Sequence, residues 1–286
     1  MWRHLLGRLN IAVHPGLRRQ LVPNKQIHGV FCGSSGGGLD AGEVICLAPF
    51  VCSVAANIAA ASPWGARLMD VLSYYSVTGE GVQVEYSKES AVTTVFCALI
   101  MHSGVGPLCS YLQWINVEHE SDTDIRRKLG EAAYARLQTV EKLNKSIILA
   151  LSEDTAKGGW QIPLAVMERA HELCSSRCVD VPRSNAVFGG PALVPFVDLI
   201  NHADDEPNMV VYVDTPQSVG VAVRQSRKFP LEFWEHMDGS RCPFYVVARA
   251  ERDIAENEEL HYRYVDSHDT FNSDPLFWAS RFHFCP

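Results

Sequence analysis

The sequence lacks long hydrophobic runs and paired cysteine motifs. No apolar stretch in its 286 residues approaches the roughly 18 residues that a membrane-spanning helix needs, so we expect no membrane partner. The nine cysteines are odd in number and scattered, and no two of them form a Cys-x-x-Cys pair. A disulfide framework is therefore not expected, and reduced, mostly buried thiols in an intracellular protein are favoured.

Acidic residues are missing from residues 1–39, which hold five Lys or Arg, whereas the rest of the chain holds 20 basic against 33 acidic residues. This acidic body lacks the basic face that binds nucleic-acid phosphates, so no nucleic-acid partner is expected. It suits a basic polypeptide partner. Residues 1–22 are basic and amphipathic, which is typical of a mitochondrial presequence and equally of a basic N-terminal helix. Mitochondrion, cytoplasm and nucleus therefore all stay open as compartments.

Motifs of several enzyme classes are also missing. The segment 33–38 contains neither G-x-G-x-x-G nor Gly-Lys-Ser/Thr, so a flexible loop is favoured over a phosphate-binding loop. The only G-x-S-x-G match, at residues 33–37, lies in this Gly/Ser loop and not in a strand-to-helix elbow, so a Ser-His-Asp hydrolase is not favoured. Four residues of metal-ligand types gather at His202, Asp204, Asp205 and Glu206. Four ligands within five residues rarely converge on one ion, so we expect no metal, although a metal-dependent hydrolase using His202 with Asp204 or Asp205 stays open.

Hydrophobic periodicity predicts strands, then helices, then strands. The first strands are expected at 29–50, on either side of the Gly/Ser loop, and another strand at 81–87. Helices are expected at 53–75, at 89–104, from residue 121 to about residue 153, and at 162–178. Later strands are expected at 208–216, 219–225, 242–254 and 258–264. This layout predicts one α+β domain with a helical insertion.

Polar residues interrupt two of the apolar segments. Asp198 lies inside "LVPFVDLINH", where a carboxylate is costly unless it is paired or hydrogen-bonded. Asn201 and His202 close that run, either as a polar turn or as a ligand site at a strand end. Arg177, taken alone, is typical of a cation in the last turn of a helix. Tyr264, taken alone, is typical of a strand tyrosine with a wet hydroxyl.

Four segments, taken in order, resemble the SET-domain protein methyltransferases, in particular the branch of the Rubisco large-subunit lysine methyltransferase and the actin-histidine methyltransferase. The segments are "HGVFCG…AGEVICLAP", "VMERAHELCSSRC", "LVPFVDLINH" and "ARAERDIAENEELHYRY". The resemblance covers most of residues 25–286. It implies an α+β SET-domain fold of small β-sheets with a threaded C-terminal segment. Residues 1–22 would precede a SET domain at 23–286, with the helical insertion at about 88–170.

The resemblance also implies roles for individual residues. The cofactor would be S-adenosylmethionine, bound by Gly29, Phe31, Arg177, Asn201, His202 and Tyr264. Tyr264 would also be the catalytic tyrosine. The substrate, a basic protein or peptide, would contact Ser176, Val179, Asp198, Phe282 and Phe284.

The implied activity is protein-lysine N-methylation. Relatives that modify histidine carry an Asn two residues after the Ser-Arg arginine, and Val179 at that position cannot hydrogen-bond an imidazole. A protein-histidine methyltransferase and a catalytically silent SET-fold peptide-binding module are the alternatives. Glycines of the family pattern are replaced by Ile27, Asn257 and His283. The Asn that usually follows the catalytic tyrosine has two candidate positions, Asn272 and Asp274.

Overall fold

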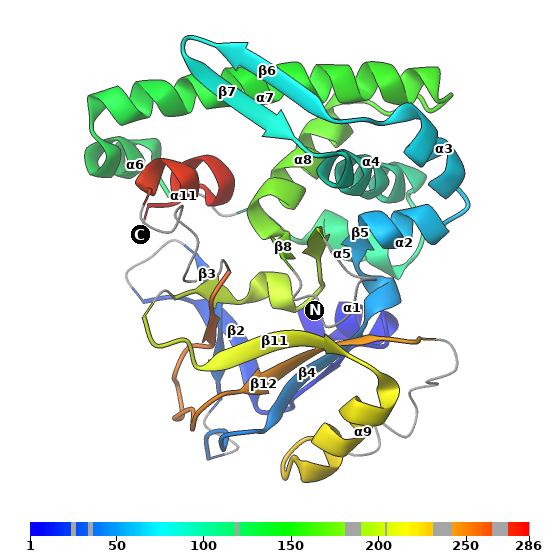
Figure 1. Cartoon of the computed structure of the whole chain (residues 1–286). Coiled ribbons are helices and arrows are strands. Elements are labelled where there is room, and N and C mark those ends of the chain that lie inside the picture. Colours follow the sequence, from blue (N-terminus) through cyan, green and yellow to red (C-terminus); the bar gives the residue numbers. More distant parts are fainter. Residues whose placement is uncertain are drawn as a thin grey trace. The chain divides into compact units, whose positions relative to one another are not determined.

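The structure, a computed structural model, describes residues 1–23, 27–33, 37–117, 120–180, 190–203, 205–230, 242–264 and 274–285. The chain divides into two units (Figure 1). Unit 1 comprises Met1–Ser53, Val179–Gly189 and Leu193–Ser267, and unit 2 comprises Val54–Cys178, Gly190–Ala192 and His268–Pro286.

Unit 1 holds most of the strands. Its elements are α1 (Trp2–Arg8), β1 (Ala12–Val13), β2 (Leu17–Leu21), β3 (His28–Cys32), β4 (Val44–Pro49), the 3₁₀ turn η1 (Phe50–Cys52), β8 (Val179–Asp180), the 3₁₀ turn η2 (Val197–Leu199), β10 (Asn201–His202), β11 (Met209–Asp214), α9 (Pro216–Gln225), β12 (Tyr245–Ala250) and β13 (His261–Tyr262).

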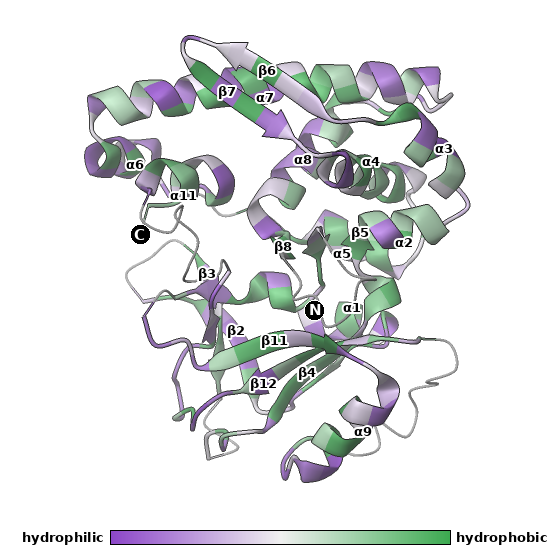
Figure 2. Cartoon of the chain, viewed as in Figure 1, coloured by the Kyte–Doolittle hydropathy of each residue, from purple (hydrophilic) through white to green (hydrophobic). Residues whose placement is uncertain are grey.

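The main sheet of unit 1 has the order β1-β4-β12-β11, with antiparallel neighbours. β4 is buried at every position, whereas β11 at the sheet edge alternates buried and half-buried residues, as a strand with one wet face does. Figure 2 shows β4 in the colour of hydrophobic residues. Val219 and Val223, one turn apart on α9, pack with Leu47 and Val247 of the sheet. This core supports the remaining strands of unit 1.

β3 connects the early and late parts of unit 1. It pairs with β2 in an antiparallel ladder from Leu17↔Cys32 to Leu21↔His28. The N–H of Leu260 donates to the Val30 carbonyl at 2.7 Å, and the N–H of Cys32 donates to the Glu258 carbonyl at 2.9 Å. The backbone from 257 to 260 therefore lies along β3.

The N-terminal segment packs into unit 1. Leu5 and Leu6 of α1 are buried, and the Trp2 ring stacks on Phe196 with a centroid distance of 6.2 Å. The Arg3 guanidinium donates to the Leu17 carbonyl at 2.5 Å. Residues 1–22 thus include two strands of unit 1; their role in targeting stays a prediction, as does the domain boundary after residue 22.

Unit 2 holds most of the helices. Its elements are β5 (Val54–Ala55), α2 (Ala56–Ala61), α3 (Gly65–Val71), β6 (Tyr75–Gly79), β7 (Val82–Tyr86), α4 (Lys88–Ser103), α5 (Pro107–Trp114), α6 (Asp122–Leu129), α7 (Glu131–Lys157), α8 (Leu164–Arg177), β9 (Pro191–Leu193, its last residue assigned to unit 1) and α11 (Pro275–Phe282).

The core of unit 2 forms around α4, in which every residue from Ala91 to Ile100 is buried. A helix that is apolar all round is stable only when neighbours surround it, and α2, α5 and α8 pack against this one. The β6–β7 hairpin lies along α7 (Figure 1). No single helix in the described part of the chain is long and apolar enough to cross a membrane; only α4 and α5, bent by 103°, meet that test as a pair.

Three predicted elements differ from the structure. The helix expected from residue 121 is two helices, because Gly130 takes a positive φ of 76° between them. The helix expected at 53–75 is interrupted between α2 and α3 at Ser62-Pro63, since proline disfavours helical backbone in the residue before it. The strand expected at 219–225 is part of α9, which Pro216 begins as an N-terminal helix residue.

Glu43 organises the segment that follows α9. Its carboxylate is 2% exposed and accepts hydrogen bonds from the Ser226 hydroxyl, from the Arg227 N–H at 2.6 Å and from the Lys228 N–H at 3.1 Å. The Ser226 oxygen in turn accepts from the Val44 N–H at 3.1 Å. One buried carboxylate therefore joins the start of β4 to this segment.

We expect Glu43→Gln to lower the free energy of unfolding by about 2 kcal/mol. The glutamine amide is uncharged, so its hydrogen bonds are not charge-assisted, and its own NH₂ group would face the donors that now bind the carboxylate. Chemical denaturation measures the change. Glu251→Gln, at an exposed glutamate of the same unit, is the matched control and should change stability by less than about 0.5 kcal/mol. Equal stability of the two variants would contradict this role of Glu43.

His14 makes the stability of unit 1 depend on pH. The side chain is 3% exposed, and its Nδ1 accepts from the Gly16 N–H at 3.1 Å. Burial lowers the pKa of His14 below its ordinary value. Below a pH of about 6.5 the unfolded chain therefore binds a proton that the folded chain does not, so the free energy of unfolding falls with pH, by at most about 1.4 kcal/mol per pH unit for this residue.

We expect His14→Asn to flatten this pH dependence in denaturation curves recorded between about pH 7 and pH 5. An Asn side-chain oxygen can still accept from the Gly16 N–H, which limits the other effects of the change. His4→Asn, at an exposed histidine of the same unit, should keep the wild-type profile. The prediction fails if His14→Asn and the wild type lose stability in parallel as the pH falls.

Candidate functional site

The site begins with two short strands of unit 1 that run side by side. β10 and β13 pair in parallel, with Asn201 opposite His261 and His202 opposite Tyr262. The turn η2 precedes β10 and contains Asp198, which is 6% exposed. The register brings two polar strand ends, far apart in the sequence, to one edge.

Tyr264 lies against the Asn-His pair. Its hydroxyl donates to the Ile200 carbonyl at 2.5 Å, and its backbone N–H donates to Nδ1 of His202 at 3.1 Å. The rings of His202 and Tyr264 have centroids 5.1 Å apart. The phenol and the Asn-His pair, which were predicted from separate segments, therefore meet.

Asn201 is held by β3 and by a carboxylate. Its side-chain amide donates to the His28 carbonyl at 3.1 Å and to Glu259 Oε1 at 2.7 Å. A Cβ at Gly29 would lie 2.1 Å from Glu259 Oε1, so only glycine leaves room for this carboxylate. The Glu259 side chain is 12% exposed, and Nε2 of His261 lies 3.5 Å from its Oε2. Glu259 was not predicted; its only signal was the second glutamate of "NEEL".

Asn208 is a second residue that the sequence analysis missed. It is 1% exposed, its amide donates to the Glu259 carbonyl at 2.7 Å, and its side-chain oxygen accepts from the His261 N–H at 2.8 Å. The side chain thus binds one backbone carbonyl and one backbone N–H on either side of Leu260, as the backbone of a neighbouring strand would. The sequence signal that could have identified Asn208 is an Asn directly before an apolar strand.

Solved structures with a similar overall fold exist. The SET domain of LSMT bound to lysine and AdoHcy matches with a TM-score of 0.66 and 15% identity, over 100% of this chain and 56% of that chain. Rubisco LSMT bound to AdoMet matches with a TM-score of 0.62 and 14% identity, over 100% of this chain and 55% of that chain. The chain has the SET-domain fold.

At this identity the likeness establishes the fold, and the chain spans about half the length of those solved structures. No family model and no curated protein matches the sequence. The predicted α+β SET-domain class is confirmed.

Two replacements of family glycines keep the backbone of the SET-domain turns. Asn257 has a φ of 64° and His283 a φ of 58°, both in the left-handed region. Asn and His enter this region more often than most residues. Asn272 lies outside the described residues, and Asp274 caps α11, where its carboxylate accepts from the Leu276 N–H at 2.9 Å.

The other predicted residues lie as follows. In unit 1, Phe31 of β3 forms a bridge with Glu259, and Val179 begins β8 with 6% of its surface exposed. In unit 2, the Ser176 hydroxyl donates to the Glu172 carbonyl at 2.6 Å. These backbone and core contacts do not test the roles proposed for Phe31, Val179 and Ser176, which stay predictions.

Three more predicted residues belong to unit 2. The Arg177 guanidinium donates to the Asn116 carbonyl. Phe282 and Phe284 pack on Trp278 with ring centroids 5.2 Å and 5.4 Å away. The two phenylalanines thus share one aromatic cluster, as residues of a common channel wall would.

The described residues give no support to the metal-site alternative. Among the described residues, no three His, Cys, Asp or Glu side chains are arranged to hold a metal ion. Asp204 lies outside those residues, and Nδ1 of His202 accepts from the Tyr264 N–H.

We expect Gly29→Ala to lower the free energy of unfolding by about 1–3 kcal/mol, because the new Cβ must displace the Glu259 carboxylate from Asn201. The double variant Gly29→Ala/Glu259→Ala removes the clash, so the two changes should couple by more than about 0.5 kcal/mol in a double-mutant cycle. Gly7→Ala is the matched control, since a Cβ there meets nothing within 4 Å. Additive effects at positions 29 and 259 would contradict this packing.

Proposed function

We propose that this chain transfers a methyl group from S-adenosylmethionine to the side-chain amine of lysine in a basic protein. The observation that carries the proposal is the contact of Tyr264 with the Asn201-His202 pair, within a SET-domain fold. Solved structures of this fold contain AdoMet or AdoHcy, and one contains lysine beside AdoHcy.

The residues at β10 suit such a methyl donor. S-adenosylmethionine carries a positive sulfonium and an amino-acid end, and it supplies an activated methyl group when bound. The Glu259 carboxylate is mostly buried, and the Asn201 side-chain oxygen receives no hydrogen bond from the described residues. Both groups can accept hydrogen bonds from a cationic ligand. Asn201 and His202 would hold the donor with Gly29 and Phe31.

Tyr264 would position the amine that receives the methyl group. Its hydroxyl donates to the Ile200 carbonyl, and a phenolic oxygen can itself accept a hydrogen bond from an amine N–H. Backbone carbonyls near Asp198 would accept another hydrogen bond from the amine. This alignment matters because methyl transfer is an in-line displacement that depends on geometry and electrostatics.

The acceptor amine must also lose its proton, since free lysine has a pKa of about 10.4. A narrow apolar channel disfavours the ammonium form by desolvation. Val179, buried and apolar, favours lysine over histidine as the acceptor.

A catalytically silent peptide-binding module is the second candidate. One observation favours it: both N–H donors of the Asn201 amide are already used, by the His28 carbonyl and by Glu259. Calorimetry with S-adenosylhomocysteine separates the candidates, because an enzyme must bind the cofactor product and a silent module need not.

We expect Tyr264→Phe to lower kcat by about 10²-fold or more, because the ring remains and the oxygen that aligns the amine is lost. The affinity for S-adenosylhomocysteine, measured by calorimetry, should stay unchanged. Tyr212→Phe, at a half-buried tyrosine of the same unit outside the site, should keep full activity. Wild-type turnover in Tyr264→Phe would rule out the proposed role.

The substrate is found with the full chain and an isotopically labelled methyl donor in a lysate, followed by mass spectrometry of the modified peptides. The proposal expects label on lysine side chains, and none when Tyr264→Phe replaces the wild type. Label on histidine but on no lysine would overturn the assignment of the acceptor.

A further inference from the structure

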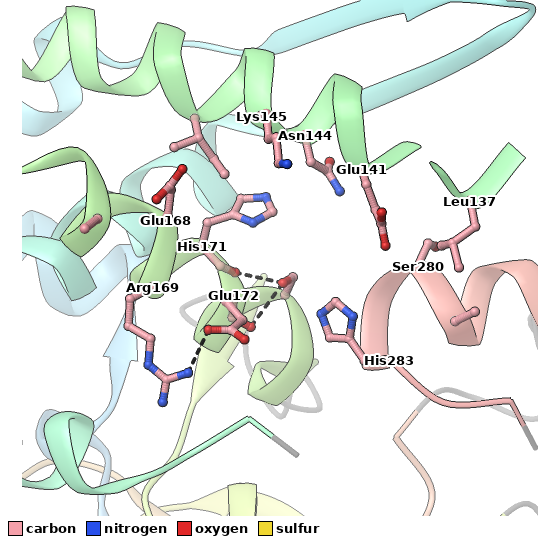
Figure 3. Close-up of a pocket in the computed structure, with 14 residues that line it drawn as sticks. Leu137, Glu141, Asn144, Lys145, Glu168, Arg169, His171, Glu172, Ser280 and His283 are labelled. Atoms are coloured by element: carbon pink, nitrogen blue, oxygen red, sulfur yellow. Dashed lines mark hydrogen bonds and ion pairs between the residues drawn. The ribbon is translucent and has the colours of Figure 1, made fainter. Parts of the chain in front are cut away.

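Three helices of unit 2 border an open hollow with apolar and polar lining residues. It has a volume of about 440 Å³ and lies among α7, α8 and α11 (Figure 3). A hollow of this size can hold an amino-acid side chain with part of its backbone. Its polar lining consists of Glu141, Asn144 and Lys145 of α7, Glu168, Arg169, His171, Glu172 and Ser175 of α8, Ser280 of α11, and His283.

The hollow is acidic, with three glutamates against one lysine and one arginine. The arginine is already engaged, because Arg169 pairs with Glu172 at 2.7 Å and also donates to the Ile115 carbonyl at 2.5 Å. Lys145, Glu141 and Glu168 are all exposed, and the long side chain of Lys145 lets its ammonium stay in water. Glu141 and Glu168 stand on opposite helices, so carboxylates are present on two walls of the hollow (Figure 3).

His171 is the residue that points to a ligand. Its side chain is 7% exposed, and its ring stacks on Tyr86 with centroids 5.5 Å apart. Its ring nitrogens make no hydrogen bond to the residues that the structure describes, although the side chain lines the hollow. Because the side chain lines the hollow, a ligand bound there can reach this imidazole and hydrogen-bond to it.

The charge state of His171 restricts the chemistry of that ligand. Burial lowers the pKa of His171, so the imidazole is neutral at pH 7 and one ring nitrogen is a hydrogen-bond acceptor. The two serine hydroxyls are used within their own helices: Ser175 donates to the His171 carbonyl at 2.8 Å and Ser280 to the Phe277 carbonyl at 3.1 Å. The hollow thus offers acceptors to a ligand, and these suit a cation rich in N–H donors.

We propose that this hollow binds a lysine or arginine side chain of the polypeptide substrate, other than the lysine that is methylated. His171 accepts one N–H of the bound cation, and Glu168 and Glu141 neutralise its charge. The identity of the occupant as substrate rests on the proposed function, whereas the binding of a basic side chain does not.

Binding is tested on the full chain with blocked tripeptides, Ac-Gly-Arg-Gly-NH₂ and Ac-Gly-Lys-Gly-NH₂, with Ac-Gly-Glu-Gly-NH₂ as the anionic control. The readout is the ¹H–¹⁵N signals of the His171 imidazole in labelled protein. We expect the basic peptides to shift these signals with a Kd near 1 mM, and the anionic peptide to leave them unchanged. No shift with either basic peptide at about 10 mM would overturn the proposal.

Glu168→Gln should weaken binding of the basic peptides about 5- to 10-fold, because a charge-assisted hydrogen bond becomes a neutral one. Glu153→Gln is the matched control, since Glu153 is exposed on α7 and does not line the hollow. His171→Phe keeps the ring that stacks on Tyr86 and should also weaken peptide binding, which the backbone ¹H–¹⁵N signals of α8 report in this variant because the imidazole is gone. Equal peptide affinity of Glu168→Gln and Glu153→Gln would overturn the proposal.

Failure of this site and failure of the proposed function give different results. Glu168→Gln should bind S-adenosylhomocysteine with wild-type affinity in calorimetry. Peptide-induced His171 shifts in a chain that does not bind S-adenosylhomocysteine would support the hollow and reject the enzyme. S-adenosylhomocysteine binding without peptide-induced His171 shifts would support the enzyme and reject the hollow as a binding site.

Discussion

The parallel pairing of β10 with β13 is the contact on which the candidate site depends. Parallel strands cannot be joined by a tight turn, and here β11, α9 and β12 occupy the connection. The pairing sets Asn201 and His202 beside the strand that leads to Tyr264. The bonds from Tyr264 to His202 and to the Ile200 carbonyl then fix the phenol at the end of β10. Without this register the two motifs would have no common geometry.

Both proposed sites present hydrogen-bond acceptors to a cation. In unit 1 the acceptors are the Glu259 carboxylate and the Asn201 oxygen; in unit 2 they are His171, Glu141 and Glu168. The Glu259 carboxylate is mostly buried, and a buried charge interacts with a positive ligand more strongly than surface charges such as Glu141 and Glu168 do. The two proposals thus give specific roles to part of the excess of acidic residues outside residues 1–39.

Local patterns predicted much of the fold. β3, β4, β11, β12 and α4 lie where apolar periodicity expected them, because burial of a repeating face leaves a direct trace in the sequence. The errors came from positions where one residue outweighs the pattern: Gly130, which breaks a long helix, and Pro216, which begins α9 in a valine-rich segment that resembles a strand. The helical turns at Asn257 and His283 needed only residues that tolerate a left-handed backbone.

The sequence by itself determined the order of the motifs, the α+β layout and the residue types that meet at the site, Asn201, His202 and Tyr264 among them. Only the tertiary structure decided their partners. Glu259 bonds Asn201 across 58 residues, beside a glycine that leaves it space, and His171 faces a hollow built by three helices. Contacts between distant segments depend on register and packing, and neither leaves a periodic signal in the chain.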